Sequence, residues 1–138
     1  MSEQPFTNAY TQPETANHNL YKTLLVVEDD QSIGETIIQV IDNETSYHAT
    51  LATDARQALE IIQKIKPNGI LLDYQLPYMN GIQFYDRLHA VEDYKDIPII
   101  LMSANLPYKE IQQRQMQTLK KPFELDELVE VIEHCLGE

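Results

Sequence analysis

The chain has a single cysteine, few basic residues and no long apolar run, and each shortage excludes a class of protein. Cys135 cannot form a disulfide within the chain, which fits a reducing compartment. Ten Lys and Arg stand against 22 Asp and Glu, and this net charge of -12 disfavours direct contact with nucleic acid or an anionic membrane. No apolar run has the length of a membrane span, and the first twenty residues lack the basic-then-apolar pattern of a signal peptide. We therefore expect a cytoplasmic protein with no membrane insertion.

The first 21 residues differ in composition from the rest of the chain. They contain Pro5 and Pro13 and many Asn, Gln and Thr, but no Lys or Arg and no hydrophobic period. This composition predicts a flexible N-terminal tail over residues 1–21. The remaining residues, 22–138, have the length of one domain that can bury a core without disulfides or a structural metal.

From Thr23 onward, short apolar runs alternate with amphipathic stretches. The runs 24–27, 47–52, 70–72, 97–102 and 118–120 are typical of strands, and the first and third suit burial on both faces. Helical spacing of apolar residues predicts helices over 31–42, 82–91 and 125–136, and another between a candidate N-cap at Asp54 and the helix breaker Pro67. Residues 107–117 are interpreted as a polar helix with a poor apolar face. Five strands alternating with five helices predict an α/β fold, with a parallel sheet covered on both faces.

Polar residues follow the predicted strands at the points where the strands end. Glu28 and Asp29 end the first strand, Asp73 the third and Ser103 the fourth, while Lys121 follows the fifth. The carboxyl ends of parallel strands share one edge of a sheet, where such folds bind ligands, so these side chains should converge there.

Three carboxylates so placed need a neutralising partner. Each pair of unit charges about 4 Å apart costs about 4 kcal/mol at a dielectric typical of protein surfaces. A hard divalent cation bound by oxygen ligands would neutralise this repulsion, and Mg²⁺ suits the set Glu28, Asp29 and Asp73. An aspartate beside Mg²⁺, a lysine and a hydroxyl can accept a phosphoryl group as an acyl phosphate. We therefore interpret Asp73 as the phospho-acceptor, with Ser103 and Lys121 as groups that contact phosphoryl oxygens.

Four motifs in this order resemble the receiver domain of bacterial two-component response regulators. They are LLVVEDD with Glu28 and Asp29, ILLDYQLPYMNG with Asp73, IILMSA with Ser103, and KPF with Lys121. The resemblance covers residues 22 to 136. It implies a flavodoxin-like (CheY-like) three-layer sandwich with strand order 2-1-3-4-5.

The resemblance also implies a function. It implies Mg²⁺-dependent phosphorylation of Asp73 by a sensor histidine kinase, and a metal ligand in the backbone carbonyl of Gln75. A histidine phosphotransfer protein is a further expected partner, to which the phosphoryl group could pass. The side chains of Gln75 and Asn105 would tune the lifetime of the phosphoryl group, and Pro122 would follow a cis peptide bond. Such a chain is not an enzyme beyond assisting its own phosphotransfer and dephosphorylation. Because little sequence follows the last predicted helix, we expect signalling by contact with a downstream protein target, without a fused output domain.

The sequence departs from the family pattern on the way into the fifth strand. Thr118 stands where the family usually has an aromatic residue that couples to the serine of strand four, and the stretch between Ser103 and Lys121 is shorter than usual. We therefore expect a short or displaced fourth helix. These departures leave open a scaffold domain that signals without phosphorylation. A Mg²⁺ phosphohydrolase is a third possibility, although Gln75 stands where such enzymes usually have a second acid. Read alone, Asp29 could be a helix N-cap and Asp73 could start a turn.

Overall fold

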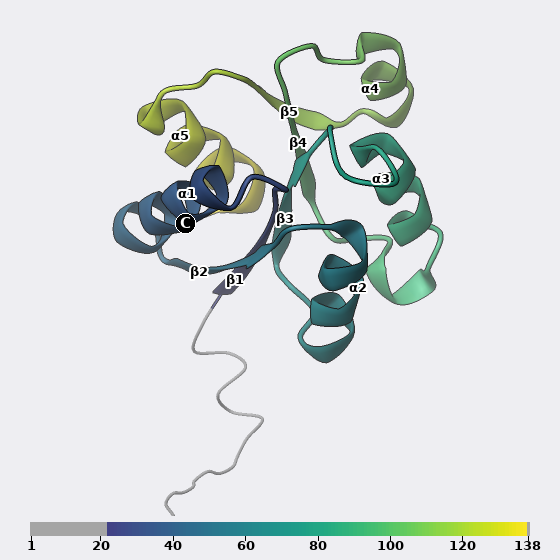
Figure 1. The fold of residues 1–138 in the computed structure, drawn as a ribbon, viewed down its shortest axis with the longest axis horizontal. Helices are drawn as coiled ribbons and strands as arrows, with labels where there is room; N and C mark the ends of the chain where they lie inside the picture. Colours follow the sequence, from purple (N-terminus) through teal and green to yellow (C-terminus); the bar gives the residue numbers. More distant parts are fainter. Residues whose placement is uncertain (1–21, 138) are drawn as a thin grey trace, which may run out of the picture.

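The computed structural model describes residues 22–137 and contains one parallel sheet in the order β2-β1-β3-β4-β5 (Figure 1). The strands are β1 (Lys22–Val27), β2 (Tyr47–Ala52), β3 (Gly69–Asp73), β4 (Ile99–Ser103) and β5 (Gln117–Lys120). The helices are α1 (Gln31–Glu44), α2 (Ala55–Lys64), α3 (Gly81–His89), α4 (Tyr108–Arg114) and α5 (Leu125–Leu136), with a short 3-10 helix at η2 (Glu92–Tyr94). The predicted α/β fold and strand order are confirmed. The predicted tail, residues 1–21, lies outside the described residues.

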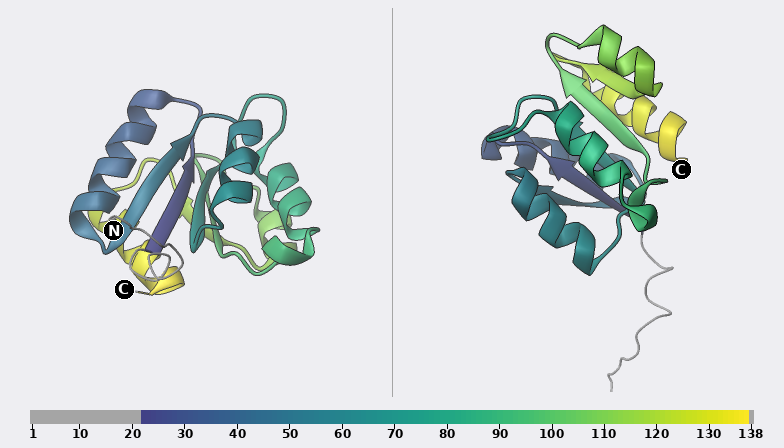
Figure 2. Two further views of the ribbon diagram at one scale, coloured as in Figure 1. Left: turned by 90° about the horizontal axis from the view of Figure 1, so that it is seen from below. Right: turned by 90° about the vertical axis from the view of Figure 1, so that its right-hand side faces the viewer.

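Each face of the sheet carries its own hydrophobic core. Because side chains alternate along a strand, Leu24 and Val26 pack with α1 and α5, whereas Leu25 and Val27 pack with α2 and α3. Figures 1 and 2 show the same arrangement, with α1 and α5 on one side of the sheet and α2 and α3 on the other. All five residues of β3 are buried, as expected for the central strand.

Local signals explain where the helices begin. The side chain of Asp54 accepts a hydrogen bond from the backbone N–H of Gln57 at 2.7 Å, which confirms the predicted N-cap of α2. The N-cap of α1 is Asp30, whose carboxylate accepts from the N–H of Ile33 at 3.0 Å. The capping alternative for Asp29 is therefore excluded.

Several element boundaries differ from the prediction, and two of these differences have a clear local cause. Strand β4 begins at Ile99 rather than at residue 97, because Pro98 has no N–H and contributes only its carbonyl, which accepts from Ile70 at 2.9 Å. Helix α4 ends at Arg114 because Gln115 adopts a left-handed conformation with φ 54°. The expectation of a short fourth helix is confirmed, and no helix in the described part of the chain has the length and apolar character of a membrane span.

Candidate functional site

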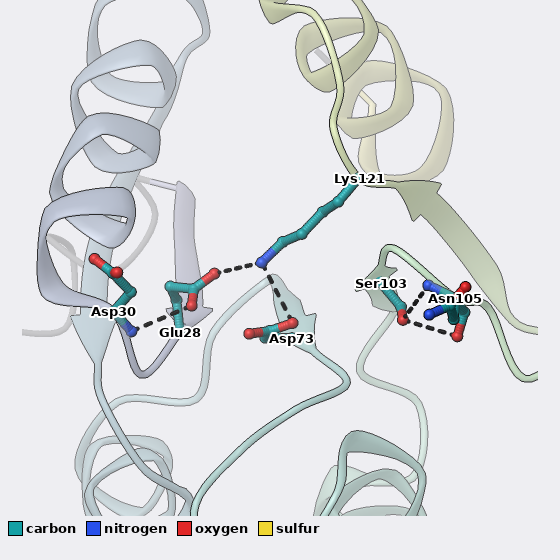
Figure 3. Close-up of polar contacts among 6 residues, drawn as sticks. All are labelled: Glu28, Asp30, Asp73, Ser103, Asn105 and Lys121. Carbon is teal, nitrogen blue, oxygen red and sulfur yellow. Dashed lines mark hydrogen bonds and ion pairs between the residues drawn. The ribbon is translucent and has the colours of Figure 1, made fainter.

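The ends of four parallel strands bring the predicted site residues to one edge of the sheet (Figure 3). Glu28 follows β1, Asp73 and Ser103 are the last residues of β3 and β4, and Lys121 follows β5. The edge positions arise from the parallel pairing, since Val27 pairs with Leu72 and Asp73 with Met102. The predicted convergence of these residues is therefore confirmed.

Three acids form the negative half of the site. One carboxylate oxygen from each of Glu28, Asp29 and Asp73 lies within 4.8 Å of the other two. Glu28 and Asp73 are buried, with 1% and 6% of their surface exposed, while Asp29 is exposed. Partial desolvation, together with the hydrogen bond and negative charge of Glu28, raises the pKa of Asp29 above its usual value. The cluster fits a divalent cation, because three convergent carboxylate oxygens that repel one another are the donor set such an ion prefers.

Lys121 supplies the positive half of the site. Its ammonium nitrogen lies 2.8 Å from Oε1 of Glu28 and 3.4 Å from Oδ1 of Asp73 (Figure 3). Desolvation acts to lower the pKa of Lys121, but the hydrogen bond to Glu28 and the charge of Asp73 outweigh it, so the pKa is raised. The sequence indicated Lys121 beside Asp73 or a phosphoryl oxygen. It did not indicate that Glu28, 93 residues away, would be the nearer partner.

The loop after Lys121 has the form that the resemblance implied. The peptide bond between Lys121 and Pro122 is cis. The backbone N–H of Lys121 donates to the carbonyl of Ser103 at 3.0 Å and extends the pairing of β4 with β5 by one residue. The backbone at Lys121 is therefore anchored to the end of β4.

Ser103 is at the expected place, but its hydroxyl is engaged in the turn that follows it. The hydroxyl donates to the carbonyl of Asn105 at 2.9 Å and accepts from the N–H of Asn105 at 3.1 Å. Figure 3 shows it facing Asn105 rather than Asp73. Ser103 is 5% exposed, so its orientation is set by this turn and not by solvent.

A cavity of about 140 Å³ opens beside Asp73 and is lined by residues of three strand ends: Asp73, Tyr74, Gln75, Ser103, Ala104, Asn105 and Lys121. Gln75 thus lies where the resemblance implied, next to the acceptor. A larger cavity of about 450 Å³, lined by residues of α3, β4 and α5 and of the loops that precede β4 and β5, contains none of the predicted site residues. The predicted site residues therefore lie at the smaller of these two cavities.

Gly81, the last residue of the motif around Asp73, has a structural role at the site. Its N–H donates to the carbonyl of Tyr74 at 2.7 Å, and a Cβ at this position would lie 2.8 Å from the carbonyl oxygen of Asp73. The first turn of α3 therefore packs directly on the backbone that presents Asp73. Thr118, at the position of the expected aromatic residue, is half-buried in β5.

Comparison with known proteins agrees with the site geometry. The family described as the response regulator receiver domain matches residues 24–133. Sporulation initiation phosphotransferase F of Bacillus subtilis is 28% identical over 117 residues, which cover 82% of this chain and 92% of that protein. Response regulator MprA of Mycolicibacterium vanbaalenii is 30% identical over 110 residues, 77% of this chain but only 46% of that protein.

Solved structures show the same fold. The chemotaxis protein CheY4 of Vibrio cholerae superposes with a TM-score of 0.76 at 27% identity, covering 84% of this chain and 99% of that one. A putative response regulator from Chloroflexus aurantiacus gives 0.77 at 27% identity, covering 86% and 99%. Receiver domains are signalling domains that interact with histidine kinases or phosphotransfer proteins. The chain belongs to the response regulator receiver domain family of two-component signalling.

Proposed function

We propose that this receiver domain accepts a phosphoryl group on Asp73 in a reaction that depends on Mg²⁺. The observation that carries the proposal is the pairing of a buried acceptor carboxylate with an ammonium at 3.4 Å, beside two further acids whose oxygens lie within 4.8 Å. Such a set neutralises charge on both sides of a transferring phosphoryl group, which is the main requirement of this chemistry.

The site residues would have different roles in this reaction. An oxygen of Asp73 attacks the phosphorus of the donor, a new O–P bond forms, and the bond from phosphorus to the donor breaks as the donor leaves with its electron pair. Asp29, Asp73 and the carbonyl of Gln75 would hold Mg²⁺ directly, with Glu28 acting through water. When bound, the ion offsets the negative charge that the phosphoryl group brings to the acids.

Lys121 and Ser103 contribute in different ways. The ammonium of Lys121 already lies beside Asp73 and would pair with a phosphoryl oxygen after small movements. The hydroxyl of Ser103 would have to leave the carbonyl of Asn105 to donate to another phosphoryl oxygen, because it has a single proton. Gln75 and Asn105 line the same cavity and would control water access to the acyl phosphate.

We further propose that the phosphodonor is a sensor histidine kinase or a histidine phosphotransfer protein, and that the signal passes to a downstream protein. The Bacillus subtilis relative is named as a phosphotransferase, which favours a place in a phosphorelay. The net charge of -12 supports protein partners rather than nucleic acid. Signalling without a fused output domain, in the cytoplasm, stays a prediction, as does a domain that begins near residue 22.

The test is a comparison of wild type with Asp73→Asn after incubation with Mg²⁺ and acetyl phosphate. Intact mass spectrometry should show one added phosphoryl group on the wild type and none on Asp73→Asn or on wild type in EDTA. Asp96→Asn is the matched control, because it removes the same charge from an exposed loop residue and should be phosphorylated normally. Absence of label on the wild type would contradict the proposal and favour a scaffold. Multiple turnover of unrelated phosphomonoesters would instead indicate a hydrolase.

A further inference from the structure

Helix α4 is attached to the domain by the packing of Ile111 against the core on the α2 and α3 face and by one ion pair. It is seven residues long and none of its residues is buried. Arg114, its last residue, donates from Nε to Oδ1 of Asp86 on α3 at 2.7 Å and from Nη2 to Oδ2 at 2.8 Å. Between described residues, this is the only ion pair outside the site that joins two helices. Figure 1 shows α4 at the edge of the molecule, next to α3.

The other end of α4 is connected to the phospho-acceptor site through a short turn. The two hydrogen bonds between the Ser103 hydroxyl and the backbone of Asn105 define this turn, and only Leu106 and Pro107 separate it from the first residue of α4. The hydroxyl proton cannot serve both the Asn105 carbonyl and a phosphoryl oxygen. Turning Ser103 toward the site therefore releases the turn that places the start of α4.

The interactions at the two ends of α4 thus favour different arrangements of the helix. A phosphoryl group on Asp73 draws Ser103 away from Asn105, whereas the Asp86–Arg114 pair favours the arrangement in which the turn is intact. The bidentate geometry of the Asp86–Arg114 pair makes it the best-ordered restraint on α4.

We propose that Asp86 and Arg114 are positioning residues, which hold α4 and the Ser103–Asn105 turn in a resting arrangement and thereby weaken phosphoryl binding at Asp73. This inference rests on the proposed function. By linkage, a contact that favours the resting arrangement lowers the affinity of any ligand that requires the other one. Half-exposed ion pairs contribute enough to change an equilibrium constant by about two- to fivefold. Removing the Asp86–Arg114 pair should therefore raise the affinity of the site for a phosphoryl mimic by about two- to fivefold.

The experiment measures the dissociation constant of beryllofluoride, a phosphoryl mimic, by calorimetry in Mg²⁺ with the full chain. Asp86→Asn and Arg114→Gln should each bind about two- to fivefold more tightly than wild type. The two substitutions change the net charge in opposite directions, so a shared effect cannot come from general electrostatics. Glu60→Gln is the matched control: it breaks the exposed Arg56–Glu60 pair on α2 and should leave the affinity unchanged.

A second comparison tests whether the pair acts through Ser103. In a Ser103→Ala background, Asp86→Asn should no longer change the affinity, because the hydroxyl that links α4 to the site is absent. Hydrogen exchange of the full chain should also be faster over residues 105–117 in Asp86→Asn than in wild type. Unchanged or weaker binding by both variants, with a wild type that binds normally, would overturn this inference alone. A wild type that does not bind beryllofluoride would overturn the proposed function as well.

Discussion

Replacing Gly81 with alanine is expected to destabilise the domain and to disturb the phospho-acceptor together. An added Cβ would lie 2.8 Å from the carbonyl oxygen of Asp73, 2.8 Å from Cδ1 of Leu101 and 3.0 Å from Cα of Tyr74. Two of these atoms belong to the backbone, so no change of rotamer can relieve the contact. Either α3 or the end of β3 must move.

The size of the effect follows from two opposing contributions. Overpacking of a well-packed site costs about 1–3 kcal/mol. Alanine in place of glycine at a helical position stabilises the folded state by about 0.5–1 kcal/mol, because less backbone entropy is lost on folding. We expect a net loss of about 1–2 kcal/mol in the free energy of unfolding. Because Asp73 and Gln75 are carried by the displaced segment, the affinity for Mg²⁺ should fall as well.

Urea unfolding followed by circular dichroism, in EDTA and in Mg²⁺, measures both consequences. Gly34→Ala is the matched control, since Gly34 is also a helical glycine with a close neighbour. The three atoms nearest to its Cβ would all belong to the side chain of Leu51, the closest being Cδ1 at 2.5 Å, and this half-buried side chain can rotate away. Gly34→Ala should therefore stay within about 0.5 kcal/mol of wild type. A Gly81→Ala protein as stable as Gly34→Ala, with normal Mg²⁺ binding, would refute the reasoning.

Two further predictions concern the ion pairs. Lys121→Met should lower the free energy of unfolding by about 2–3 kcal/mol in EDTA, because the buried Glu28 loses its partner. Saturating Mg²⁺ should raise the free energy of unfolding more in this variant than in wild type. An equal increase in both proteins, measured by urea unfolding, would contradict the role of the acids in holding the ion. The hydrogen bond from Arg114 lowers the pKa of Asp86 in the folded state. The ion pair therefore stabilises the fold fully at a pH above the usual pKa of aspartate. This stabilisation is lost as the pH falls through the lower pKa of the folded state. Asp86→Asn should thus be about 0.5–1 kcal/mol less stable than wild type at pH 7, a modest value because Asp86 is half-exposed. The difference in stability should shrink below about pH 4. A stability difference that does not depend on pH would contradict this prediction.

Much of the fold could be predicted because its signals are local. The apolar run of β3 and the N-cap at Asp54 depend on neighbours within a few residues, and both are confirmed. Strand ends that carry Glu28, Asp73 and Lys121 indicated a shared site, because parallel strands present their carboxyl ends at one edge. The chemical roles of these residues stay predictions.

The exposure of single side chains was less predictable. The helical period places Leu125 on the same face of α5 as Leu128 and Ile132, yet Leu125 is 56% exposed while the other two are fully buried. A helical period identifies a face of a helix. It does not say how much of that face a neighbouring element will cover.

The amino-acid sequence alone determined the order of strands and helices and the type of each residue at the strand ends, since both are set by short-range pattern and by the geometry of a parallel sheet. Only the tertiary structure decided which partners those residues take. Lys121 pairs most closely with Glu28, and Arg114 pairs with Asp86. Hydrogen bonds and ion pairs act over a few ångströms, and distances of that size between residues tens of positions apart exist only once the chain has folded.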